Sequence, residues 1–139
     1  MQTYEISDTL QKWRLFEYVS PNGRQAIADW RKGLPVGQPR AYLDIFLRDM
    51  VKRDVWEPPD FEALHGKQQG LWELRWKCGK LPHRIVGYTL TEHQFLMLIG
   101  CTHRESYDPQ DALNTALVRK TQIQDEKASY DEYKLITGR

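Results

Sequence analysis

The sequence predicts an α+β fold with a mostly antiparallel sheet of about four strands. Two observations lead to this prediction. Three strand-like stretches follow one another between residues 64 and 104. Helix-like stretches are grouped before and after them instead of alternating with them, which is typical of this class. Two N-terminal helices are expected on one face of the sheet, and one helix is expected at its C-terminal end.

The N-terminal half is expected to contain one strand and the two helices. Residues 13–19 are aromatic and β-branched, as in a strand, and Asn-Gly at 22–23 suits the turn that follows. A short helix is expected at about 24–32 and the longest helix at 40–55. The apolar stripe of the longer helix consists of Tyr42, Ile45, Phe46, Met50 and Val51.

The remaining strands are expected at 71–77, 83–90 and 94–100. Alternation along the first of them places Trp72, Leu74 and Trp76 on a packing face, and Glu73, Arg75 and Lys77 on a charged face. The third is nearly all apolar, which indicates a strand covered on both faces. Residues 61–64 are expected to form a short turn.

The last predicted helix spans about 110–120, where Asp108 can act as its cap and Pro109 suits its first turn. We therefore expect one domain at residues 1–120 and a polar C-terminal extension at 121–139 that is compatible with one more short helix. One hypothesis for this acidic extension is that it shields the functional site or docks a partner.

The charge of the chain is unevenly distributed. Its net charge is only +1, yet residues 64–104 carry six Lys or Arg, two acids and all four histidines. A local excess of Lys, Arg and His suits a phosphate-rich ligand. No metal-ligand spacing and no nucleotide-binding glycine motif is present, so no cofactor is expected.

A cytoplasmic protein is expected from three features. The longest apolar runs fall short of the ~20 residues that span a bilayer. The first eight residues lack a basic-then-apolar signal pattern. Cys78 and Cys101 could form a disulfide in an oxidising compartment, but a reduced pair in the cytosol is the better default.

Four short motifs occur in a fixed order between residues 64 and 109. They are Leu64-His-Gly66, Gly70-Leu-Trp-Glu-Leu-Arg75, Arg84-Ile-Val86, and Gly100-Cys-Thr-His103-Arg104 followed by Pro109. In this order they resemble the RelE/HigB superfamily of ribosome-dependent mRNA-cleaving toxins, most closely its phage-derived, HigB-like branch. The resemblance implies a small RelE-like domain that is the toxin of a type II toxin–antitoxin system.

The same resemblance implies the partners. A concave sheet face would grip mRNA in the ribosomal A site, and a cognate helix-turn-helix antitoxin would neutralise the toxin. Operator DNA would then be contacted only through the antitoxin, and no membrane partner is expected. Cleavage by the 2′-hydroxyl of the RNA itself needs a proton acceptor, cations on the phosphate and a proton donor, but no metal.

Arg75 and Arg84 are the first candidates for the catalytic phosphate contact, because a guanidinium is always charged and matches two phosphate oxygens. His103, with Arg104 beside it, is the favoured proton-transfer residue, since histidine titrates near neutrality. The alternative for Arg75 is a cross-strand ion pair with an acid such as Glu73 or Glu92. The alternative for His103 is an ordinary surface histidine.

The predicted RNA-binding residues are His65, Lys67, Lys77 and Tyr107. The two lysines could equally be solvated, and Tyr107 could pack the last helix instead of stacking on a base. His83 could be a partner acid or a turn residue. Two other functions stay open: a non-catalytic, phage-derived regulator that binds RNA or protein, and a structural phage protein whose charged sheet is an assembly surface.

Overall fold

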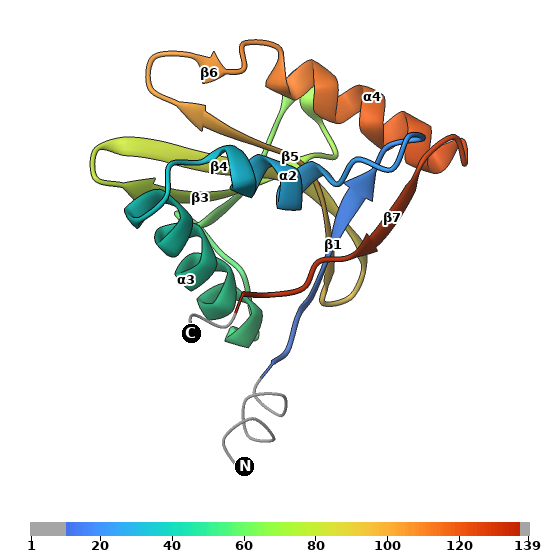
Figure 1. Cartoon of the computed structure of the whole chain (residues 1–139). Helices are drawn as coiled ribbons and strands as arrows, with labels where there is room; N and C mark the ends of the chain where they lie inside the picture. The colour runs from blue at the N-terminus through green and yellow to red at the C-terminus, as the bar shows by residue number, and fades with distance from the viewer. Residues whose placement is uncertain (1–10, 137–139) are drawn as a thin grey trace.

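A computed structural model describes residues 11–136 and contains a mixed sheet flanked by helices (Figure 1). Residues 1–10 lie outside the described part. They are the first ten residues of the predicted domain and include residues 1–8, where no signal pattern is predicted. The strands are β1 (Arg14–Val19), β2 (Phe61–Ala63), β3 (Trp72–Cys78), β4 (Leu81–Thr91), β5 (Gln94–His103), β6 (Tyr107–Asp108) and β7 (Ser129–Glu132). The helices are α2 (Ala26–Gly33), α3 (Gln38–Lys52), α4 (Ala112–Gln124) and the short 3₁₀ helix η1 (Gly66–Gln68).

The sheet corrects the predicted fold. Within the described residues it has seven strands in the order β2-β3-β4-β5-β1-β7, with β6 paired to β5. Strand β1 runs parallel to β5, whereas the other pairs are antiparallel. Residues 11–136 thus form an α+β structure with three α-helices and a mixed seven-stranded sheet, and the prediction of a mostly antiparallel, RelE-like sheet of about four strands is wrong.

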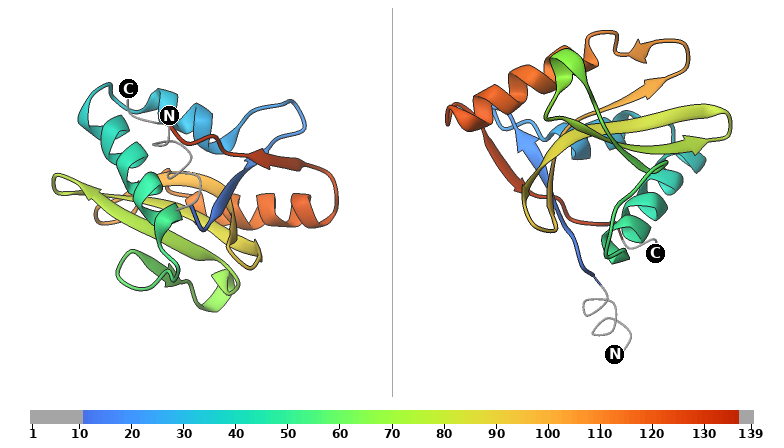
Figure 2. Two further views of the ribbon diagram at one scale, coloured as in Figure 1. Left: turned by 90° about the horizontal axis from the view of Figure 1, so that it is seen from below. Right: turned by 180° about the vertical axis from the view of Figure 1, so that it is seen from behind.

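Helices cover both faces of this sheet. Helices α2 and α3 pack on one face with the apolar side chains of Leu15, Phe95 and Met97. Helix α4 packs on the other face over Leu96 and Leu98. The view from behind in Figure 2 shows this helix on the near side of the sheet. The side chains of β5 are therefore divided between two cores, and the prediction that this apolar strand is covered on both faces is confirmed.

A close contact between α2 and the sheet explains why residue 100, in the last of the four motifs, is a glycine. The indole ring of Trp30 lies against Gly100 of β5, where a Cβ atom added to the glycine would lie 2.2 Å from the Cδ2 atom of Trp30. Glycine at this position lets α2 approach the sheet backbone. The start of α2 is held from β1, since Glu17 Oε1 accepts hydrogen bonds from the backbone N–H groups of Ile27 (2.8 Å) and Ala28 (2.9 Å).

The C-terminal part differs from its prediction in two ways. Asp108 lies in β6 and does not cap α4, whose N-cap position is Asp111. In the described part of the extension, where a second short helix was predicted, α4 continues to Gln124 and β7 then pairs with β1. In the strand order, β7 is separated from β4 by β5 and β1, so this strand does not lie beside β3 and β4.

Candidate functional site

Four charged side chains from three neighbouring strands form an alternating charge quartet, which we define as Glu62, Arg75, Glu73 and Arg84. The register places the two glutamates opposite one another on β2 and β3, and the two arginines opposite one another on β3 and β4. Like charges that face each other across strands are unfavourable. Here each like pair is bridged by an opposite charge, because Arg75 lies between the carboxylates and Glu73 lies between the guanidinium groups.

Glu73 is the buried centre of the quartet, with no exposed surface. Its Oε1 accepts hydrogen bonds from Arg75 Nε (2.9 Å) and Arg84 Nη1 (3.1 Å). Another nitrogen of the Arg75 guanidinium, Nη1, donates to Glu62. A buried carboxylate is tolerated when it is paired and hydrogen-bonded in this way.

Tyr107 connects the quartet to His103. Its hydroxyl donates a hydrogen bond to Glu73 Oε2. The guanidinium carbon of Arg84 lies 5.8 Å from the centre of the Tyr107 ring, and the His103 ring meets that ring edge-on at 4.5 Å. Four residues predicted separately from the sequence, namely Arg75, Arg84, His103 and Tyr107, are thus brought together around Glu73.

Burial and the Glu73 carboxylate raise the pKa of Tyr107 to about 12. The Tyr107 hydroxyl therefore keeps its proton at neutral pH and acts as a donor. Burial likewise raises the pKa of the Cys101 thiol to about 12, so this side chain, on the β5 strand beside Arg84, is not a ready nucleophile. Both Cys101 and Cys78 are free thiols.

The other predicted site residues lie around this cluster at varying distance. Lys77 is exposed and lines a hollow of about 340 Å³ together with Glu62, Arg75 and Arg84. Arg104 is exposed just after β5, and His65 and Lys67 are exposed at η1. No hydrogen bond or ion pair joins these last three side chains to the cluster within residues 11–136. The functional roles of these three residues therefore stay predictions.

His83 is not part of this site. It is only 3% exposed and lies between Trp30 and Trp76 on the face that α2 and α3 cover. Its Nδ1 is 3.1 Å from the carbonyl oxygen of Leu81. Because side chains alternate along β4, the neighbouring positions 83 and 84 point to opposite faces, which removes His83 as the partner acid.

Sequence reasoning missed the two acids as site residues. The alternation along β3 did place Glu73 on the charged face. The alternative that Arg75 pairs with an acid such as Glu73 is confirmed, but this pair lies within β3, and the cross-strand partner of Arg75 is Glu62. The signal that could have identified Glu73 is its position two residues before Arg75 on that face. No sequence signal identified Glu62, because β2 has only three residues and was expected to be a turn.

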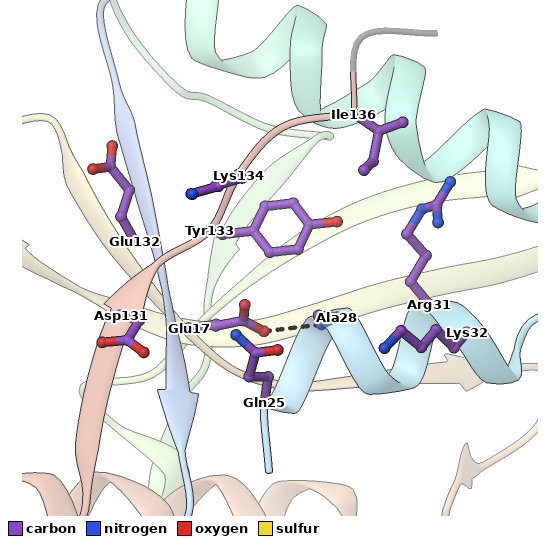
Figure 3. Close-up of a pocket in the computed structure, with 10 residues that line it drawn as sticks. All are labelled: Glu17, Gln25, Ala28, Arg31, Lys32, Asp131, Glu132, Tyr133, Lys134 and Ile136. Carbon is purple, nitrogen blue, oxygen red and sulfur yellow. Dashed lines mark hydrogen bonds between the residues drawn. The ribbon is translucent and has the colours of Figure 1, made fainter. Parts of the chain in front are cut away.

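A second, larger hollow of about 600 Å³ lies between α2 and the C-terminal segment (Figure 3). Its floor includes the carboxyl group of Glu17, and its rim includes Arg31, Lys134 and Tyr133. Arg31 is already paired with Asp44 through two hydrogen bonds of 2.8 and 2.7 Å. Glu17 and Arg31 thus have structural partners, and none of the predicted site residues lines this hollow.

Comparisons of the chain with protein-family models, with curated proteins and with solved structures find no match. In residues 11–136, no helix is both long and apolar enough to cross a membrane. The case for a function therefore rests on the residues and their arrangement.

Proposed function

We propose that the protein is the toxin of a type II toxin–antitoxin system and acts as a ribosome-dependent endoribonuclease on translated mRNA in the cytoplasm. Its partners in this proposal are mRNA in the ribosomal A site and a cognate helix-turn-helix antitoxin. The observation that supports the proposal is the convergence of Arg75, Arg84, His103 and Tyr107 on one sheet face. These side chains come from four strands, β3, β4, β5 and β6, and the motif order had singled out Arg75, Arg84 and His103.

In the proposed reaction, the 2′-hydroxyl oxygen of the RNA attacks the adjacent phosphorus and the bond to the 5′-oxygen of the next nucleotide breaks. The products are a 2′,3′-cyclic phosphate and a 5′-hydroxyl. Arg84 and Arg75 stabilise the charge that builds on the phosphate oxygens. His103 takes the proton of the 2′-hydroxyl, the departing 5′-oxygen takes a proton from solvent water, and Arg104 adds positive charge beside His103. Tyr107 is protonated at neutral pH and donates its single O–H to Glu73, so in this scheme it holds that carboxylate in place and is not the base.

The substrate contacts around this centre are proposed for exposed groups. Lys77 lies at the hollow that Arg75 and Arg84 line, so it is well placed to bind the RNA backbone. His65 and Lys67 would contact the backbone farther along the strand.

Growth after induced expression tests the proposal. The wild-type protein should arrest growth, and Arg84→Ala should relieve the arrest, because it removes a phosphate contact. Arg14→Ala is the matched control: Arg14 is an exposed arginine in an ion pair with Glu132, on β1 and β7 at the far side of the strand order. This control should arrest growth like the wild type.

Normal growth of cells that express folded wild-type protein, with intact ribosome-bound mRNA, would contradict the proposal. So would equal arrest by the wild type and by Arg84→Ala.

One observation favours a second candidate, a non-catalytic regulator that binds RNA or protein. The two positive charges of the quartet are matched by two carboxylates, and the guanidinium of Arg75 is bonded to both of them. A neutralised centre of this kind suits binding as well as catalysis. Salt-dependent RNA binding without cleavage would favour this candidate.

A further inference from the structure

The two carboxylates of the quartet differ in how firmly they are held. Glu73 has no exposed surface and accepts bonds from three side chains. The Glu62 side chain is 39% exposed, and Arg75 is its ion-pair partner. Glu62 also lies on a three-residue strand at the edge of the sheet. The pair between Glu62 and Arg75 is therefore easily opened, whereas Glu73 stays in place.

The hollow beside this pair already has the residues of an anion site. Arg75, Lys77 and Arg84 line it, and the carboxylate of Glu62 lies among them. Among residues 11–136, the side chain of Arg84 gives one hydrogen bond, from Nη1 to Glu73. Its Nε also lacks a partner but is buried, so an anion in the hollow would meet the terminal nitrogens of this guanidinium. An anion that took the place of the Glu62 carboxylate would meet three cationic side chains at once.

We infer that Glu62 is an internal competitor for the RNA phosphate. Its carboxylate occupies Nη1 of Arg75 until a phosphodiester group displaces it. The inference rests on the proposed function for the identity of the anion. A phosphate and a carboxylate present the same kind of charged oxygen to a guanidinium, and both form strong, charge-assisted hydrogen bonds with it. An exposed ion pair within the protein contributes little, so the exchange has a low cost.

This arrangement makes the two glutamates act in opposite senses. Glu73 orients Arg75 and Arg84 and thereby favours binding. Glu62 lowers the affinity for RNA and protects the site from weakly bound anions. The resting protein would then select a polyanion that offers several phosphates over a single small anion.

The test is the affinity of the purified full chain for a short single-stranded RNA in which every 2′-hydroxyl is methylated, so that it cannot be cleaved. We expect Glu62→Gln to bind this RNA about two- to fivefold more tightly than the wild type. The slope of log affinity against log salt should be the same for the two proteins, because the phosphate contacts Arg75 in both complexes and only the competing carboxylate differs.

Asp60→Asn is the matched control. Asp60 lines the same hollow and removing its charge changes the net charge equally, but its carboxylate pairs with Arg53 and not with Arg75. It should change affinity less than Glu62→Gln. Equal effects of the two variants, or no tighter binding by Glu62→Gln, would overturn the inference, as would a failure of both wild type and Glu62→Gln to bind.

The two proposals fail separately. If Glu62→Gln binds more tightly, but no form of the protein cleaves unmodified mRNA on ribosomes, the competitor role stands and the enzymatic function falls. If the wild type cleaves mRNA and Glu62→Gln binds no more tightly than it does, the enzymatic function stands and the competitor role falls.

Discussion

Glu73 contacts both arginines of the quartet and Tyr107, so its removal should be costly for stability. Glu73→Gln leaves two guanidinium groups without their buried counter-charge, and we expect a loss of about 3 kcal/mol in the free energy of unfolding. Glu62→Gln removes an exposed pair and should cost less than about 1 kcal/mol. Urea denaturation of both variants measures the difference. Equal losses would show that burial does not distinguish the two carboxylates.

Glu17 predicts a particular pH dependence. Burial raises its pKa above the ordinary 4.5. The hydrogen bonds from the backbone of α2 lower the pKa, but their effect is smaller than that of burial. The folded protein then binds the Glu17 proton more tightly than the unfolded chain does, so this group lowers stability as pH rises from about 4.5 through its folded pKa. Glu17→Gln removes that cost, and its stability relative to the wild type should be higher at pH 7 than at pH 4.

Glu132→Gln should show the opposite sign in the same urea experiment. Arg14 lowers the pKa of Glu132, so its charge contributes stability above the ordinary pKa and loses that contribution as pH falls. The relative stability of Glu132→Gln should therefore be lower at pH 7 than at pH 4. If Glu17→Gln followed this pattern as well, the role assigned to Glu17 would be wrong.

At the scale of secondary-structure elements, β7 is held to the sheet more by the residue that follows it, Tyr133, than by its own side chains. All four residues of β7 are exposed, but Tyr133 is only 6% exposed and its backbone N–H donates to the Leu15 carbonyl at 2.8 Å. Tyr133→Ala should lower the free energy of unfolding by about 3 kcal/mol. Tyr130→Ala, at a position 42% exposed, should cost less than about 1 kcal/mol. Similar losses in thermal and urea unfolding would contradict this role of Tyr133.

The longer elements were predictable because their side chains repeat with a clear period. The sequence indicated strands at 71–77 and 94–100 and a helix at 40–55, and the structure has β3, β5 and α3 there with shifted ends. Strands of two to four residues, such as β2, β6 and β7, are too short to show a period. Their own residues do not indicate their partners, and β7 and β1 pair with strands far away in the chain.

The sequence predicted the cationic residues of the site but not its acidic residues. Arg75 and Arg84 were singled out by residue type and by motif order, and the register places them opposite each other. Whether a charged side chain is neutralised depends on the strand beside it. Glu62 joins the site only because the unpredicted strand β2 pairs with β3.

At the scale of the whole molecule, the cationic excess of residues 64–104 is smaller on the folded surface than in the sequence. Arg75 and Arg84 are tied to Glu73, and Glu62 from outside that segment adds a further negative charge. RNA binding therefore depends on a few donors that stay available, and less on a broad positive field. This is why a single substitution of Arg75 or Arg84 should have a large effect on function.

The most direct test of the proposed function is cleavage of an mRNA bound to purified ribosomes, with analysis of the rate and of the RNA ends. We predict that the wild-type protein cuts the mRNA and leaves 2′,3′-cyclic phosphate ends, and that Arg84→Ala slows cutting by at least about 10²-fold while Arg14→Ala does not. Intact mRNA after incubation with the wild type, or equal rates for the wild type and Arg84→Ala, would contradict it.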